Sequence, residues 1–292
     1  MDALLRAAPA PQAPFSQGYV LIETATIGYA AGLERLPSVP CAPAALSHRV
    51  ELMPRLVNVS ALSPEQQTEI TEVMRDELDG DRPPVICAWL QSSWPVDRLA
   101  EHVARYLVGP GANGSPVLWR YYDPRVISLA TSVLELARLS ALLGPVDMWA
   151  LPAVGRWWTI RGDGHEAPPL EGITPAWPTP SQWERIEYSD LAARALARLS
   201  DQKYDFRDLS RLMGALCKSF DDAKQKAGLS DPEALIDYAV HDMRYGRAFT
   251  EHKKLEQAWP AIRRGELSWP GALALLTSAD FESLKDQYAV IA

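Results

Sequence analysis

The sequence predicts an α+β (mixed α/β) protein, in which a lobe with a small sheet precedes an all-helical lobe. Short apolar runs alternate with helical patterns in the first half of the chain, whereas the second half shows only helical periodicity. Composition also changes near residue 181, because 21 of the 24 prolines precede it and all seven lysines follow it. These three observations together indicate two lobes of different architecture.

The predicted organisation has four parts. Residues 1–17 form a flexible N-terminus, 18–160 the α/β lobe, 161–180 a linker rich in Pro and Gly, and 181–292 the helical lobe.

The predicted strands of the first lobe are short, apolar or β-branched, and bounded by turn residues. They comprise 19–25, 56–59, 85–90, 116–122, 146–151 and 157–160. Two helices, 64–78 and 95–107, each begin with Pro after a Ser-containing segment, which is typical of a capped start. The alternation predicts helices packed on a modest sheet, whose strand order the sequence does not define.

Helices of the second lobe are marked by apolar stripes and by caps. One stripe comprises Leu209, Leu212, Met213, Leu216 and Phe220, and another Leu235, Ile236, Ala239, Val240 and Met243. Ser181 with Glu184 fits a capping box, and Asp231 before Pro232 fits a cap followed by a first-turn proline.

Charge and composition argue against several classes of function. The formal net charge is -8, so the chain has no basic excess for nucleic acid or an anionic membrane. Cys41, Cys87 and Cys217 are widely spaced and read as reduced, buried thiols. The N-terminus lacks the pattern of a signal peptide and no run of eighteen apolar residues occurs, so we expect a cytoplasmic protein without membrane insertion.

The most distinctive segment is Val117-Leu118-Trp119-Arg120-Tyr121-Tyr122-Asp123-Pro124-Arg125-Val126, a predicted strand that runs straight into a helix. Asp123 can cap that helix and Pro124 can occupy its first turn. The helix carries a stripe from Val126 to Ala137, with Leu129, Leu136 and Leu143 on a second side, which predicts burial over much of its circumference. A tight joint between strand and helix follows.

This segment resembles the type VI secretion effector adaptors, the Tap or TEC chaperones that carry domain of unknown function 4123. The resemblance rests on Arg120, Tyr122, Asp123, Pro124 and Arg125, with support from Tyr19-Val20-Leu21-Ile22, Pro54-Arg55-Leu56-Val57, the stretch from Trp89 to Leu107 and Leu143-Gly144-Pro145. It covers roughly residues 18–160.

The resemblance implies a bacterial, non-enzymatic protein that binds a cognate toxic effector and helps to load it onto the VgrG or PAAR spike. The partners that it implies are therefore the effector and a spike protein. We expect no catalytic, cofactor-binding or metal-binding residues.

Three motifs suggest chemistry, and each has a simpler interpretation. Gly109 to Gly114 matches G-x-G-x-x-G but follows a helical pattern and precedes a strand, so we interpret it as a loop. Arg120, Asp123 and Arg125 could form an acid–base cluster, although capping and a charge-assisted joint explain them without a substrate. Residues 162–166 lie in the predicted linker.

His241 and Asp242 carry the rival hypothesis, a metal-dependent hydrolase, because both lie on a predicted helix with His252 further along. The remaining histidines fall in the other lobe, which favours a solvated helix face. A third hypothesis is a structural component of the secretion apparatus.

Ten tryptophans are more than a core of this size needs. Half of them lie on predicted strands, and most are expected in the core. The candidates for contact with a partner lie near loops and helix ends: Trp177, Trp183, Trp259 and Trp269.

Overall fold

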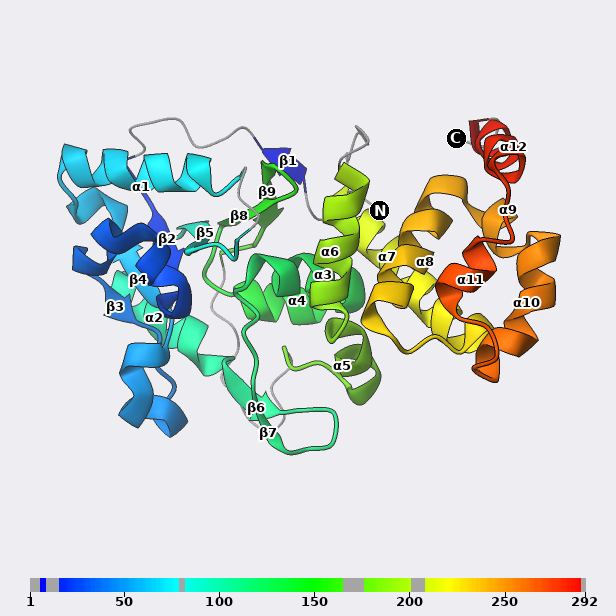
Figure 1. Cartoon of the computed structure of the whole chain (residues 1–292). Helices are drawn as coiled ribbons and strands as arrows, with labels where there is room; N and C mark the ends of the chain where they lie inside the picture. The colour runs from blue at the N-terminus through cyan, green and yellow to red at the C-terminus, as the bar shows by residue number, and fades with distance from the viewer. Residues whose placement is uncertain (1–5, 9–15, 79–81, 165–175, 201–207, 290–292) are drawn as a thin grey trace. The chain divides into compact units, whose positions relative to one another are not determined.

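The computed structural model describes residues 6–8, 16–78, 82–164, 176–200 and 208–289, which divide into two compact units (Figure 1). The first unit extends to Ile186 and also includes residues 208–210. The second contains the other described residues from Glu187 onward. A small sheet in the first unit and helices in the second confirm the predicted α+β class.

A seven-stranded antiparallel sheet organises the first unit, in the order β1-β9-β8-β5-β2-β4-β3. A separate hairpin pairs β6 with β7. The strands are β1 (Arg6–Ala8), β2 (Tyr19–Ile22), β3 (Val39–Pro40), β4 (Arg55–Asn58), β5 (Ile86–Gln91), β6 (Val108–Pro110), β7 (Pro116–Leu118), β8 (Met148–Ala153) and β9 (Arg156–Arg161).

Both faces of this sheet are covered. Successive side chains of β2 point to opposite faces, and those of Val20, Leu21 and Ile22 are all buried. Val20 and Ile22 belong to a buried cluster that includes Ile70 and Met74 of α1 (Pro64–Asp76), while Leu21 between them is also fully buried. α2 (Val96–Arg105) contacts β3 and β4, and α3 (Pro124–Val133) contacts β8. Figure 1 shows α1 on one side of the sheet and α2 and α3 on the other. The sheet is therefore the middle of three layers.

Three 3-10 helical segments follow the strands β2, β3 and β4, and the two longer segments each contain a kink. They are the 3-10 stretches η1 (Thr24–Arg35), η2 (Ala44–Leu52) and η3 (Val59–Ala61). The predicted strand 19–25 is thus too long, because the chain leaves the sheet after Ile22 and Glu23 caps η1. The predicted strand 116–122 is also too long, since only Pro116–Leu118 pair, and they pair in the hairpin.

The N-terminal boundary also differs from the expected one. Arg6–Ala8 lies in the segment predicted to be flexible, yet it forms β1 and pairs with β9. Of the predicted linker, residues 165–175 lie outside the described part of the chain. α5 (Pro180–Ile186) groups with the first unit because Trp183 packs against Trp119, so the division follows Ile186 rather than the predicted linker.

Helix starts follow the expected chemistry in most cases. Ser63 and Gln66 form a capping box at α1 with Pro64 in the first turn, as predicted from the Ser-Pro pair. α2 differs, because Pro95 itself is the cap residue and no side chain caps the helix. The Ser92 hydroxyl does not cap the helix. It accepts a hydrogen bond from the Trp94 amide and donates one to the Pro145 carbonyl.

The helix after Asp123 is not continuous. Leu134 and Glu135 are extended and separate α3 from α4 (Leu136–Leu143). The side-chain amide of Gln182 on α5 donates to the Val133 carbonyl at 3.1 Å and to Glu135 at 2.9 Å, so it satisfies a carbonyl at the end of α3. The single stripe predicted from Val126 to Ala137 is wrong for this reason.

Gln182 also corrects the predicted cap of α5. The Thr179 hydroxyl accepts from the Gln182 amide and the Gln182 side chain accepts from the Thr179 amide, so the reciprocal box is Thr179 with Gln182 and not Ser181 with Glu184. The chain enters the helix two residues earlier than the pattern indicated.

The second unit is helical, as predicted. Its helices are α6 (Ser189–Ser200), most of α7 (Leu209–Asp222), the π-helical turn η4 (Ala223–Ala227), α8 (Pro232–Tyr245), α9 (Arg247–Thr250), α10 (Lys253–Arg263), α11 (Trp269–Leu273) and α12 (Ser278–Ala289). Asp231 caps α8 through the Ala234 amide, which confirms the predicted start. Among the described residues, no helix combines the length and apolar character needed to cross a membrane.

Candidate functional site

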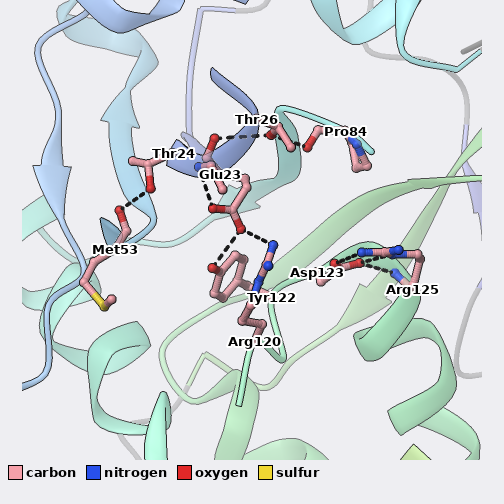
Figure 2. A network of polar contacts seen from close by, with 10 residues as sticks. Glu23, Thr24, Thr26, Met53, Pro84, Arg120, Tyr122, Asp123 and Arg125 are labelled. Carbon is pink, nitrogen blue, oxygen red and sulfur yellow. Dashed lines mark hydrogen bonds and ion pairs between the residues drawn. The ribbon is translucent and has the colours of Figure 1, made fainter. Parts of the chain in front are cut away.

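A buried carboxylate connects the distinctive segment to the centre of the sheet. Glu23 follows β2 directly and is 2% exposed. One carboxylate oxygen accepts from the Ala25 amide at 2.9 Å, and the other accepts from the Tyr122 hydroxyl at 2.9 Å and from Arg120. Figure 2 shows Arg120 and Tyr122 reaching Glu23 side by side. The network therefore attaches the residues after β7 to the end of β2.

Burial keeps the phenol of Tyr122 protonated. Loss of solvent raises the pKa of Tyr122 far above its ordinary value, and the nearby Glu23 carboxylate adds to the rise. The phenol therefore remains a donor, and Glu23 keeps a neighbouring cation in Arg120. All three groups act as fixed structural partners, which is what a rigid joint requires.

A second pair of side chains begins α3. Asp123 is 5% exposed, accepts from the Arg125 amide at 2.9 Å and caps the helix, with Pro124 in its first turn. The Arg125 guanidinium donates two hydrogen bonds to the same carboxylate, at 3.0 and 2.7 Å. The predicted cap is confirmed, and the bidentate pair strengthens it.

The five motif residues thus act as two groups rather than one. Arg120 and Tyr122 contact Glu23, whereas Asp123, Pro124 and Arg125 form the helix start (Figure 2). Sequence reasoning missed Glu23. Its signal was an acidic residue placed immediately after the apolar strand Tyr19–Ile22, where a buried charge needs a cation from elsewhere in the chain.

A small cavity of about 140 Å³ adjoins this network. Arg120, Tyr122 and Glu23 form part of its wall, and the rest comes from the start of η1, from the end of η2 with the residues after it, and from β7. These other lining residues are Thr24, Ala25, Glu51, Leu52, Met53, Pro54 and Leu118. Two motif residues, Arg120 and Tyr122, therefore contact both the joint and the cavity.

The four tryptophans predicted to contact a partner are buried, with exposures of 4% for Trp177, 8% for Trp183, 7% for Trp259 and 3% for Trp269. Trp177 and Trp183 pack on Trp119 in the first unit, and Trp259 and Trp269 pack on Tyr238 in the second. These four side chains lie near loops and helix ends, and aromatic packing makes them core residues of their units. Their contact with a partner stays a prediction.

His241 and Asp242 do not form a common site. His241 donates from Nδ1 to the Asp237 carbonyl at 2.8 Å and stacks on Phe249, whereas Asp242 accepts from Ser219. Burial raises the pKa of Asp242. Within the described ranges, no group of three or more His, Cys, Asp or Glu side chains is arranged to hold a metal ion.

The glycine-rich segment connects two strands. Gly109 lies in β6, and the turn before β7 is held by Gly111 and by the Asn113 side chain, which accepts from the Ser115 amide. A dinucleotide site needs a helix directly after the glycines, and β7 stands there instead. Of the segment 162–166, Asp163 accepts from Ser140, while His165 and Glu166 lie outside the described residues.

The fold and the site define an α+β domain in which two buried carboxylates, each paired with a partly exposed arginine, fix one strand end and one helix start. Residues 42–141 match the family model described as Domain of unknown function (DUF4123), in agreement with the resemblance noted in the sequence. This domain is associated with type VI secretion effector adaptors. The match includes the five motif residues and excludes Glu23. No curated protein and no solved structure matches the chain.

Proposed function

We propose that this chain is a cytoplasmic bacterial adaptor that binds one cognate type VI secretion effector and helps to load it onto a VgrG or PAAR spike protein. The observation that carries the proposal is the family match over residues 42–141, which contains the whole segment from Arg120 to Arg125. The family is linked to effector adaptors. The protein acts by binding, without catalysis or a cofactor.

The chemistry of the site supports a binding role. Each titratable group of the motif has a partner within the domain: Arg120 and Tyr122 pair with Glu23, and Asp123 pairs with Arg125. Such pairs hold geometry, whereas a general acid or base needs a proton that it can exchange with a substrate. The adjoining cavity has exposed leucines at its mouth, which suits a protein surface better than a polar metabolite.

The test is affinity purification of the tagged chain from its native cell, followed by mass spectrometry and by secretion measurements after deletion of the gene. We expect one effector and one spike protein among the partners. Deletion should remove that effector from the culture medium while other substrates of the same apparatus are still secreted. Loss of all secretion would support a structural component instead.

The hydrolase hypothesis makes a different prediction. An enzyme at His241 and Asp242 would retain a stoichiometric metal ion after purification and would lose it on His241→Ala substitution. Elemental analysis of the wild type and this variant distinguishes the two functions. Recovery of a tightly bound metal together with no effector would overturn the adaptor proposal.

A further inference from the structure

The cavity beside Arg120 has an apolar mouth. Among the described residues, only five large hydrophobic side chains are strongly exposed, and two of them line this one cavity. Leu52 at the end of η2 is 57% exposed and Leu118 at the end of β7 is 48% exposed. Met53 and Pro54 continue the apolar surface inward. Two separate segments thus present leucines to the same opening.

The size of the cavity restricts what it can hold. Its volume of about 140 Å³ is well below the roughly 300–1,000 Å³ of pockets for cofactors and drug-sized ligands. It is close to the roughly 150 Å³ of a cavity that accepts a benzene-sized group. The occupant that fits is one apolar side chain, such as Leu, Met or Phe, supplied by another protein.

The polar wall defines the second part of the ligand. Both oxygens of Glu23 already accept hydrogen bonds, so the wall offers no free acceptor there. Arg120 Nε, in contrast, is buried and has no acceptor within the described part of the chain. The Arg120 side chain as a whole is 41% exposed, so its guanidinium can donate to an acceptor oxygen that a partner brings to this wall.

Charge indicates which acceptor fits. The Arg120 guanidinium is already neutralised by Glu23, and Glu51 adds a negative charge at the cavity. A partner carboxylate would meet this surplus of negative charge, whereas a main-chain carbonyl is neutral and can still accept from a cationic donor. The complementary ligand is an apolar side chain next to a main-chain carbonyl.

We propose that the cavity between Leu52, Leu118 and Arg120 is a docking pocket for one apolar side chain of the cognate effector. The inserted side chain packs between the two leucines, and a neighbouring carbonyl of the effector accepts from Arg120. This inference rests on the proposed adaptor function and assigns it a surface. A buried apolar anchor surrounded by satisfied polar groups is the usual form of a binding hot spot.

The experiment uses the full-length chain and the effector that mass spectrometry identifies in the native complex, purified separately. The affinity of the effector is measured for the wild-type chain and for the variants Leu52→Asp and Leu118→Asp. Matched controls are Leu136→Asp and Leu275→Asp, because these leucines are equally exposed, at 55% and 45%, and do not line the cavity. We expect binding weakened by roughly tenfold or more for each cavity variant, and unchanged binding for both controls.

Folding and the nature of the occupant are controlled separately. Thermal melting of each variant excludes misfolding, and Leu52→Ser and Leu118→Ser replace the aspartates if either one unfolds. A photo-crosslinker at position 118 should label an apolar residue of the effector, whereas one at position 136 should not. Light scattering reports whether the wild type is a dimer that the cavity variants dissociate, in which case a second copy is the occupant and the proposal is wrong.

The outcomes separate the two proposals. If the effector binds the wild type and the cavity variants equally, the docking pocket is refuted while the adaptor function stands. If the wild type purifies with no effector at all, the adaptor function fails and the pocket fails with it. Equal weakening by the cavity variants and the controls also contradicts this site.

Discussion

At the scale of single residues, the joint depends on a charge that is removed from solvent. Glu23 is 2% exposed and, in the part of the chain that the structure describes, pairs with the cation Arg120, whose side chain remains 41% exposed. A buried carboxylate is tolerated only when its charge is paired and its oxygens accept hydrogen bonds. The stability of the first unit is therefore more sensitive to Arg120 than to ordinary surface arginines.

Arg120→Met should lower the free energy of unfolding by about 3 kcal/mol, since it leaves the Glu23 charge buried without a cation. The double variant Arg120→Met/Glu23→Gln should lose less than the single variant, because no charge is then buried. Urea denaturation measures both. Arg264→Met is the control, because its ion pair with Glu266 is more than half exposed and its loss should leave the stability almost unchanged. A double variant less stable than Arg120→Met would contradict this account.

Asp123→Ala should cost about 1 kcal/mol of folding free energy, since it removes the α3 cap and the partner of Arg125. Asp123→Asn should retain most of that stability, because Asn is an equally good cap and loses only the charge. Thermal melting in parallel with denaturant titration provides the measurement. An unchanged melting temperature for Asp123→Ala would show that the cap does not stabilise the fold.

At the scale of elements, local capping and tertiary contacts compete for the ends of helices. The sequence predicted α1 and α8 well, because Ser63 and Asp231 cap them through residues three positions away. It did not predict the break at Leu134 and Glu135, where Gln182 arrives from 47 residues further along the chain. A helix end stabilised from a distant segment leaves no local signal.

The last turn of α4 accepts a hydrogen bond from a buried histidine, and this contact should depend on pH. His102 on α2 is 2% exposed and donates from Nε2 to the Leu142 carbonyl at 3.0 Å, which fixes the neutral tautomer. Its ring also fills the space beside Gly144, whose φ of 50° suits glycine. Burial lowers the pKa of His102 from 6.5 to about 4.

Stability should therefore fall as pH falls through this window. Between pH 6.5 and about 4, the unfolded chain binds a proton at His102 that the folded chain excludes, so unfolding becomes more favourable. His102→Gln retains a donor for Leu142 and does not titrate. We expect the wild type to lose up to about 3 kcal/mol more than this variant on acidification, measured by urea denaturation at several pH values. Parallel profiles would show that His102 does not contribute.

At the scale of the whole molecule, two cores are built by different patterns. The first unit is organised around the sheet and α1, and the second around helices such as α7 and α8. Composition and periodicity were enough to predict this division of architecture. They could not locate the boundary, because α5 joins the first unit through tertiary contacts such as the packing of Trp183 on Trp119 and its hydrogen bond to the Pro110 carbonyl.

The candidate site was predicted only in part for the same reason. The strand–helix joint at Asp123 uses neighbouring residues, so spacing reveals it. The pair between Glu23 and Arg120 joins residues 97 positions apart, and one sequence contains no record of that distance. The tryptophans predicted to contact a partner lie near loops and helix ends, and they are buried because side-chain packing, rather than position near a loop, determines burial.

A substitution in the core of one unit should destabilise that unit and leave the other unchanged. Ile70→Ala in α1 and Phe220→Ala in α7 both truncate fully buried side chains and should each cost about 3 kcal/mol. Hydrogen exchange read by mass spectrometry should show lost protection in the first unit for Ile70→Ala and in the second for Phe220→Ala. Equal loss in both units from either substitution would indicate one cooperative core.

The position of Glu23 limits how the family segment can be moved between proteins. Residues 42–141 carry Arg120 and its neighbours but exclude β2, β8 and β9, which supply the centre and one side of the sheet. A graft cut at those limits would transplant a guanidinium without its counter-ion and an open sheet edge without its neighbours. A chimera that receives this segment must therefore also receive β2 and Glu23. The part of the chain that has to be transferred is thus longer than the part that matches the family.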